Sequence, residues 1–244
     1  MIDYKISIVI RTYNEKKHIK SVLDSLFTQE YKNFEVIIVD SGSNDGTKEI
    51  FEQFPVKVVN IKKEDFNYSY ASNIGVEHAS GDIICFLSGH SVPISNNYLE
   101  LTNSIFQNER VGACYGEVIA LPDGSFTEKS FNYIGMLKSK LKLKGKESGV
   151  ILEKKIHPGI FSCSNASARK DLLIKFPFQV ELGKGGEDVE VAFRIIEEGY
   201  VIAKVPELLV QHSHGKNFIA FLQEYKGWKT MYADVISYIE RSKR

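Results

Sequence analysis

Short apolar runs alternate with amphipathic stretches through the first part of the chain. The runs are rich in β-branched residues and predict buried strands at 6–10, 34–39, 56–59 and 82–87. Between them, apolar residues three and four positions apart predict helices at 19–26, 47–54 and 70–79. Strands that alternate with helices are typical of a parallel sheet built from right-handed crossover units. The pattern therefore predicts an α/β fold.

The second part of the chain has a less regular pattern. A helix is predicted at 189–198, after the glycine-rich stretch 183–188, and a last strand at 201–205. The segment 217–244 is predicted as one amphipathic helix or a pair of helices. Lysines at alternate positions from 138 to 146 predict a mobile loop or an exposed helix end. We find no internal repeat and no linker-like composition, so we expect a single domain.

Composition excludes several classes of protein. The 244 residues are 43% hydrophobic, which is enough for a full core. Because 31 Lys and Arg balance 31 Asp and Glu, the basic excess of a dominant nucleic-acid binder is missing. Three scattered cysteines cannot form a disulfide framework, and no apolar run is long enough to cross a bilayer. We expect a cytoplasmic protein, with the lysine run as a candidate peripheral contact with anionic lipid at the inner face of the membrane.

Polar turns follow the predicted strands, at the edge where open α/β sheets bind ligands. Asp40 ends the second strand, and its carboxylate is suited to accept the imide N–H of a uracil or thymine ring. Thr12, Tyr13 and Glu15 end the neighbouring strand and are candidates to hold base and ribose. The alternative is that residues 40–47 form only a turn and a helix cap, and we interpret Asp45 within them as structural.

These motifs together resemble family 2 glycosyltransferases, which have the GT-A fold. The resemblance rests on the order and spacing of Ser7–Glu15, Val39–Thr47, Asn73, Gly81–Asp82, Phe86–Leu87, Asn165–Ala166 and Glu187–Asp188. It implies a Rossmann-like, mostly parallel sheet flanked by helices, in a single domain at 1–216 followed by a helical tail at 217–244. Within that domain it implies a nucleotide-sugar half at 1–93 and an acceptor half at 94–216. The donor contacts that we expect are Thr12, Tyr13, Glu15, Asp40, Ser41, Asn73, Gly81, Asp82, Ser88 and Lys226.

The sequence departs from the family pattern after the fourth strand. Members of the family have Asp-x-Asp there, whose last carboxylate ties a divalent cation to the diphosphate, whereas this chain has Ser88-Gly89-His90. A neutral imidazole binds Mn²⁺ but suits Mg²⁺ poorly, so we expect a divalent cation with Mn²⁺ favoured over Mg²⁺. The alternatives are that His90 donates directly to phosphate without a metal, with Lys216 or Lys226 adding charge, or that it is only a loop residue.

Two further histidines flank Ser213. If the segment is extended, His212 and His214 point to opposite faces, so only one of them reaches the site. The resemblance implies a histidine that binds metal or diphosphate here, and we assign His214, with His90, to the metal.

The acidic pair Glu187–Asp188 is predicted to open a helix. The resemblance makes Asp188 the general base for the acceptor hydroxyl, and a base must lie within hydrogen-bond reach of that hydroxyl. Glu187 would hold the acceptor or orient Asp188. The alternative is that both residues only cap the helix and complement its dipole.

The resulting prediction is an inverting glycosyltransferase that uses a UDP- or dTDP-sugar donor. Its acceptor would be a hydroxyl of a glycan or lipid-linked glycan in surface polysaccharide synthesis, and the Asp40-Ser41-Gly42-Ser43 motif is similar to that of rhamnosyltransferase-like members. One rival is a non-catalytic nucleotide-sugar-binding protein, motivated by the missing Asp-x-Asp. The other is a nucleotidyltransferase, but that class needs a glycine-rich phosphate loop after the first strand, and 11–15 contains no glycine.

Overall fold

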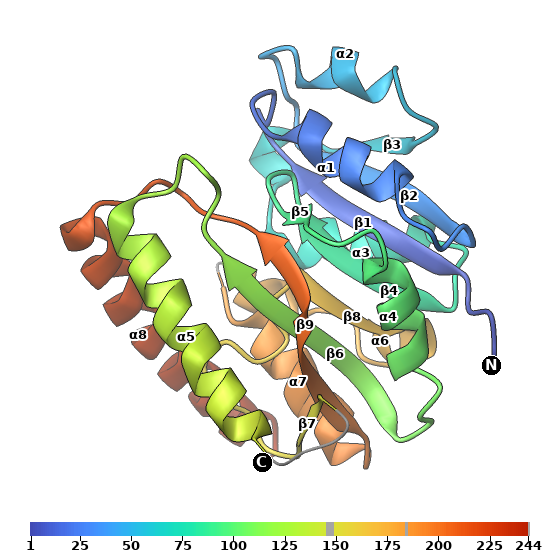
Figure 1. The fold of residues 1–244 in the computed structure, drawn as a ribbon. Helices are drawn as coiled ribbons and strands as arrows, with labels where there is room; N and C mark the ends of the chain where they lie inside the picture. Colours follow the sequence, from blue (N-terminus) through green and yellow to red (C-terminus); the bar gives the residue numbers. More distant parts are fainter. Residues whose placement is uncertain (145–148, 184, 244) are drawn as a thin grey trace.

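The computed structural model describes residues 1–144, 149–183 and 185–243. Its first half is a parallel sheet with the order β3-β2-β1-β4 (Figure 1). The strands are β1 (Ile6–Thr12), β2 (Phe34–Asp40), β3 (Lys57–Asn60) and β4 (Ile83–Ser88). The helices between them are α1 (Ile19–Phe27), α2 (Thr47–Phe51) and α3 (Tyr68–His78), with a short 3-10 turn at Lys63–Asp65. The alternation predicted from the sequence is confirmed, with ends shifted by a few residues.

The second half extends the same sheet with strands of both directions. Its strands are β5 (Val92–Pro93), β6 (Val111–Ile119), β7 (Ile151–Glu153), β8 (Asn165–Arg169) and β9 (Val201–Gln211). The described sheet runs β3-β2-β1-β4-β8-β6-β9-β5, and β7 also pairs with β9. Because β5, β7 and β8 run opposite to the other described strands, the sheet is mostly parallel, as predicted.

Helices cover both faces of the sheet. The remaining helices are α4 (Tyr98–Ile105), α5 (Phe126–Leu143), α6 (Lys170–Lys175), α7 (Glu187–Glu197) and α8 (Phe218–Ser242), with a 3-10 turn at Val180–Leu182. Successive residues of a strand point to opposite faces, so each strand contributes to two cores. Alternate residues of β1 such as Ile8 and Ile10 pack with α1 and α4, whereas Val9 packs with α3, α6 and α7. The fold is therefore a single α/β domain.

One predicted strand differs from the structure. β9 continues to Gln211, beyond the predicted end at Val205, because its pairing with β6 shifts register after Val205 and resumes at Leu209. The bulge accommodates Pro206, whose missing N–H is a reason to expect a strand to end. The tail forms one helix, α8, which is the first of the two predicted alternatives. The lysine run begins within α5, while Lys146 lies outside the described residues.

Two predictions about the chain as a whole can be compared with the structure. All three cysteines are free and buried; the sequence predicted only that they form no disulfide framework. Among the described residues, no helix is both long and apolar enough to span a membrane.

Candidate active site

Asp40 lies at the carboxyl end of β2, directly beside Thr12 of β1. Its carboxylate is fully buried and accepts hydrogen bonds from the backbone N–H groups of Gly42 and Ser43 at 3.1 and 3.0 Å. The hydroxyls of Thr12 and Ser43 donate to its other oxygen, and the Lys48 ammonium lies 3.4 Å away. The carboxylate therefore shapes the turn after β2, and a base would have to displace one of these polar partners. Asp45 has the structural role expected of it, since its carboxylate accepts from the N–H of Thr47 within the turn before α2.

Three residues lie near Asp40 at the carboxyl ends of β1 and β2: Ser41, Tyr13 and Lys63. The Ser41 hydroxyl is buried and has no hydrogen-bond partner in the part of the chain that the structure describes, so it is a polar atom available to a ligand. The Tyr13 ring is partly exposed, and the Lys63 ammonium lies 4.7 Å from its centroid. An aromatic face, a free hydroxyl and nearby cations suit a nucleoside diphosphate.

Three imidazoles meet on the same edge of the sheet. His90 follows β4, and His212 and His214 follow β9; we call these three residues the histidine cluster. One ring nitrogen from each lies within 4.8 Å of the others. The rings of His90 and His212 are stacked with centroids 4.4 Å apart, and His214 meets both rings edge to face. The expectation that only one of His212 and His214 reaches the site is wrong. β9 ends at Gln211, so strand alternation does not apply beyond it.

Hydrogen bonds orient two of the cluster's rings. Glu15 accepts from Nδ1 of His90 at 2.7 Å, and we assign the proton to Nδ1 because a carboxylate can only accept. Nε2 of His90 carries the lone pair of the neutral ring, and it is buried without a hydrogen-bond partner among the described residues. Nδ1 of His212 lies 3.1 and 3.0 Å from the hydroxyls of Ser88 and Ser91. Ser88, expected to contact the donor, instead orients His212 in this structure.

Gly89 allows the first of these contacts. A Cβ at this position would lie 2.5 Å from Cγ of Glu15 and 3.0 Å from Cγ2 of Thr12. Only glycine therefore lets the turn after β4 pack against the turn after β1. This close approach brings Glu15 within hydrogen-bond distance of His90, and so links the turn after β1 to the histidine cluster.

The residues of the cluster fit a divalent cation. Burial lowers the pKa of His212 well below its usual range, and the nearby charges of His90 and His214 lower it further. Desolvation also lowers the pKa of His214, although its ring is partly exposed. Neutral imidazoles are metal ligands, and an orphaned nitrogen held by a carboxylate behind it is the arrangement seen at metal-binding histidines.

The Glu187–Asp188 pair lies at the start of α7 on the same side of the molecule. Gly186 precedes it with a left-handed φ of 93°, and a Cβ there would lie 2.4 Å from Val235 of α8. Burial and the adjacent charge of Glu187 raise the pKa of Asp188 to about 7. Burial also raises the pKa of Glu187, against the opposing effect of Arg11. A carboxyl whose pKa is close to neutrality is suited to general-base chemistry.

Arg11 connects the two chemical groups of the site. It leaves the end of β1 between β2 and β4, and its guanidinium lies 3.6 Å from the Glu187 carboxylate. It also donates to the Ser72 hydroxyl at 3.2 Å and lies over the Tyr68 ring. Its positive charge lowers the pKa values of both Asp188 and His212. Arg11 is therefore a cation placed between the carboxylate pair and the histidine cluster.

Four residues expected at the donor site lie apart from this cluster. The side chain of Asn73 exchanges two hydrogen bonds of 2.9 Å with the backbone of Phe178. Gly81 and Asp82 precede β4 and bond to the start of β1, at the opposite end of the sheet from Asp40. Lys226 is exposed on α8. The hydrogen bonds of Asn73, Gly81 and Asp82 join distant segments of the chain, so these three residues support the fold.

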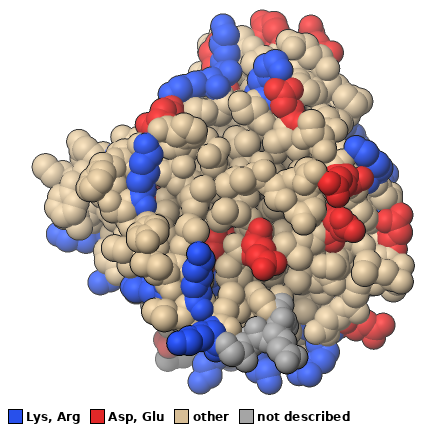
Figure 2. All heavy atoms as spheres, in the orientation of Figure 1, with Lys and Arg blue, Asp and Glu red and all other residues tan. Residues whose placement is uncertain are grey.

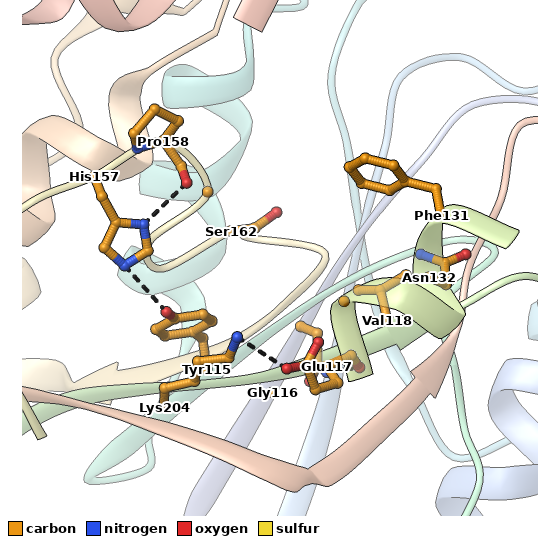
Figure 3. A pocket seen from close by; sticks show the side chains of 13 residues that line it. Tyr115, Gly116, Glu117, Val118, Phe131, Asn132, His157, Pro158, Ser162 and Lys204 are labelled. Atoms are coloured by element: carbon orange, nitrogen blue, oxygen red, sulfur yellow. Dashed lines mark hydrogen bonds and ion pairs between the residues drawn. The ribbon is translucent and has the colours of Figure 1, made fainter. Parts of the chain in front are cut away.

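A polar hollow opens on the second half of the chain, with a volume of about 240 Å³ (Figure 3). Its wall includes an ion pair of 2.9 Å between Lys204 and Glu117, with Phe131 of α5 on the opposite side. The Tyr115 hydroxyl donates to Glu153 at 2.8 Å, and Glu153 also holds Nε2 of His157. Asn165, which also lines the hollow, pairs with Leu87 at the carboxyl end of β4, so the hollow adjoins the edge that carries the site.

Sequence reasoning missed Arg11, His212 and Ser91, as well as the residues of this hollow. Arg11 directly follows an apolar strand, which is a signal that could have identified it. His212 was set aside by the alternation argument. The polar residues of the hollow come from β6, α5, the loop before β8, β8 and β9, so no single stretch of sequence marks them.

The fold and the edge of its sheet define a protein of GT-A type. A solved mannosyltransferase, PcManGT from Pyrobaculum calidifontis in complex with GDP-Man and Mn²⁺, superposes with a TM-score of 0.67 at 22% identity. The match covers 96% of this chain and 62% of that one.

The sequence comparisons identify the family. The sequence model described as Glycosyl transferase family 2 matches residues 7–176, and the chain belongs to this family. Glycosyltransferase AglE of Haloferax volcanii is 30% identical over 215 residues, covering 85% of this chain and 66% of that protein. The O-antigen chain rhamnosyltransferase RfbN of Salmonella typhimurium is 26% identical over 215 residues, covering 86% and 67%. The chain thus spans about two thirds of the length of these relatives.

Proposed function

We propose that the protein is an inverting glycosyltransferase that uses a UDP- or dTDP-linked sugar. The observation that carries this proposal is that one sheet edge holds two complementary groups. They are the histidine cluster, with one ring nitrogen of each residue within 4.8 Å of the others, and a carboxylate pair with raised pKa values, with Arg11 between them. The first suits a cation and a diphosphate, and the second suits removal of a proton from an acceptor. Membership of the family supports the same activity.

The donor nucleotide would bind over the ends of β1 and β2. Asp40 would accept from the imide N–H of the base, with Thr12 and Ser41 beside it and Tyr13 against the ring. Asp40 already has five polar partners, so we expect the base to replace one of them, such as the exposed ammonium of Lys48. Guanine would meet the same carboxylate with a different donor pattern, so nucleotide choice is an outcome of the experiment.

His90, His212 and His214 would hold the divalent cation. When bound, the cation would neutralise charge on the leaving diphosphate. Three nitrogen ligands suit Mn²⁺ and other transition metals better than Mg²⁺, which prefers oxygen. Glu15 would fix the ring of His90, and Ser88 and Ser91 that of His212.

Asp188 would act as the general base. The acceptor oxygen forms a bond to the anomeric carbon of the donor sugar, while the bond from that carbon to the diphosphate oxygen breaks and its electron pair stays with the diphosphate. The proton of the acceptor hydroxyl goes to the Asp188 carboxylate. Attack opposite to the leaving group inverts the anomeric centre. Glu187, held by Arg11, would keep Asp188 beside this path.

The acceptor would be a glycan, and we assign the hollow around Tyr115 and His157 to part of it. Its wall has both charges paired within the protein, together with an aromatic side chain, which suits an uncharged sugar. The relation to a rhamnosyltransferase that builds O-antigen chains supports a role in surface polysaccharide synthesis.

The experiment is release of nucleoside diphosphate from a set of UDP-, dTDP- and GDP-sugars, with and without glycan acceptors. We expect turnover with one of the first two classes, and a product of inverted anomeric configuration by nuclear magnetic resonance. Asp188→Asn should keep donor affinity but lower transfer by at least about a hundredfold. Glu181→Gln, an exposed carboxylate in the preceding 3-10 turn, is the matched control.

Three results would contradict the proposal. Donor binding with no transfer and no hydrolysis would favour a non-catalytic binding protein. Retained anomeric configuration would remove the single-displacement step. Near-normal turnover by Asp188→Asn would leave the pair as a helix cap only.

A further inference from the structure

We propose that the outward faces of α5 and α8 form a docking surface for an anionic lipid bilayer. Figure 1 shows the two helices side by side at one end of the molecule. Their contact is a cluster of aromatic rings: Phe131 of α5 lies 4.8 Å from Phe221 of α8, and Trp228 lies 6.4 Å from Phe221, centroid to centroid. The two helices therefore form one continuous surface, which we call the α5–α8 face.

The polarity of α5 is opposite to that of an ordinary surface helix. Its polar residues Glu128 and Ser139 are buried, where Glu128 caps the helix and Ser139 donates to Glu117 of β6. Its apolar residues Tyr133, Leu137 and Leu141 are 62%, 43% and 71% exposed. Because residues four apart share one face of a helix, these three form a stripe that points away from the protein.

α8 continues the apolar surface. Phe218 and Ile219 in its first turn are 62% and 68% exposed, and Leu222 and Tyr225 are also exposed. A soluble surface seldom exposes a contiguous apolar patch of this kind without a partner. In Figure 2 this end of the molecule is mostly tan, with basic side chains below it.

Lysines border the stripe of α5. Lys129 and Lys140 lie about three turns apart on one side of it, and Lys138 lies on the other side. Within the described part of the chain, Lys138 and Lys140 have no ion-pair partner. Apolar residues at the centre with lysines at the borders are typical of a helix that lies in a membrane interface, where long lysine side chains reach the headgroups.

Charge favours a bilayer over a second copy of the chain. In a two-fold symmetric dimer the same patch would face itself, so the lysine borders would meet like charges. Anionic headgroups complement those lysines instead, at a contribution of about 1 kcal/mol for each cation near the surface. We therefore assign the bilayer as the occupant.

The α5–α8 face begins beside the candidate active site. Glu128, at the start of α5, accepts from the backbone N–H of His214, and Lys216 pairs with Glu224 of α8. A protein seated on this face would hold its histidine cluster close to the lipid surface. This would present the site to an acceptor carried on a lipid, a consequence that rests on the proposed function, whereas the docking surface itself does not.

The experiment is co-sedimentation of the whole chain with vesicles, without any sugar substrate. Wild-type protein should bind vesicles of phosphatidylcholine with phosphatidylglycerol more tightly than pure phosphatidylcholine. Lys138→Gln with Lys140→Gln should weaken binding to the anionic vesicles about 25-fold, because each cation contributes a factor of about five. Leu137→Ser with Leu141→Ser should weaken binding to both vesicles by about tenfold or more.

Each pair of substitutions has a control of the same kind that lies away from the α5–α8 face. Lys20→Gln with Lys62→Gln removes the same charge, and Ile174→Ser removes an apolar side chain that is 64% exposed on α6; both should leave binding unchanged. Thermal unfolding should show that all variants fold. Absence of vesicle binding by the wild type, or equal losses in the controls, overturns the proposal. So does a wild-type dimer in solution that Leu137→Ser with Leu141→Ser dissociates.

Discussion

Removing the carboxylate of Glu15 should weaken binding of a divalent cation to the histidine cluster, although Glu15 is not itself one of the proposed ligands. Its Oε1 accepts from Nδ1 of His90 at 2.7 Å, and this bond leaves the lone pair on Nε2. That nitrogen is buried and has no hydrogen-bond partner among the described residues. In Glu15→Ala the ring can rotate, and its proton can move to Nε2, where it blocks ligation.

The expected loss of metal affinity can be taken from other proteins, where carboxylates also hydrogen-bond to metal-ligating histidines. Losing the carboxylate behind a ligating histidine weakens metal binding about 10- to 100-fold, or about 1.4–2.7 kcal/mol. Glu15→Gln should give a smaller loss, because a neutral amide oxygen can still accept from Nδ1 but does not stabilise the developing positive charge on the ring. The contact between Glu15 and His90 also depends on Gly89, because a Cβ there would lie 2.5 Å from Cγ of Glu15.

Calorimetric titration with Mn²⁺ in the absence of donor measures the effect directly. Glu49→Ala is the matched control, because Glu49 is an exposed carboxylate on α2, away from the cluster. His90→Ala should abolish most of the binding. If Glu15→Ala binds Mn²⁺ as tightly as the wild type while His90→Ala does not, the orienting role assigned to Glu15 is wrong. If neither variant changes the affinity, the cluster is not the metal site.

Three other predictions concern the carboxylates. The rate of transfer should rise as pH rises through about 7, because Asp188 accepts a proton only when it is ionised. Burial and the charge of Glu187 raise the pKa of Asp188, whereas the charge of Arg11 lowers it. The nearby Cys163 thiol is neutral, because burial raises its pKa. A flat rate between about pH 5 and 8 would contradict this assignment. The pKa of Asp188 in the folded state lies above its usual value, so ionisation of this carboxyl destabilises the folded state. Asp188→Asn should therefore raise the free energy of unfolding, measured with denaturant, at about pH 8 but not at about pH 4. Asp40→Asn should weaken binding of uridine or thymidine diphosphate about tenfold by calorimetry, because a charged acceptor is lost; unchanged affinity would remove Asp40 from the base site.

Local patterns were sufficient to predict the parallel half of the sheet. A strand such as β1 has continuous β-branched residues because both of its faces are buried, and α1 has its apolar residues on one face only. Since parallel strands end at one edge, the place of Asp40 beside Thr12 followed from the order of the elements. The family resemblance, and not a local pattern, implied that the pair Glu187–Asp188 opens a helix, as it does in α7.

The composition of the site depended on contacts between distant parts of the chain. His90 and His212 are far apart in the sequence, and only the pairing of β9 with β5 and β6 brings His212 to the turn after β4. That pairing passes through a bulge at Pro206, which no local rule predicts.

The orientation of α5 was decided in the same way. Its polar face is buried because Ser139 donates to Glu117 of β6 and Glu128 accepts from the backbone N–H of His214. The hydrophobic pattern of α5 alone would therefore have placed the wrong face against the protein. Periodicity identifies an element because it depends on the backbone geometry of neighbouring residues. Which side chains meet, and which face stays exposed, depends on free energies of packing and hydrogen bonding that exist only once the elements have assembled.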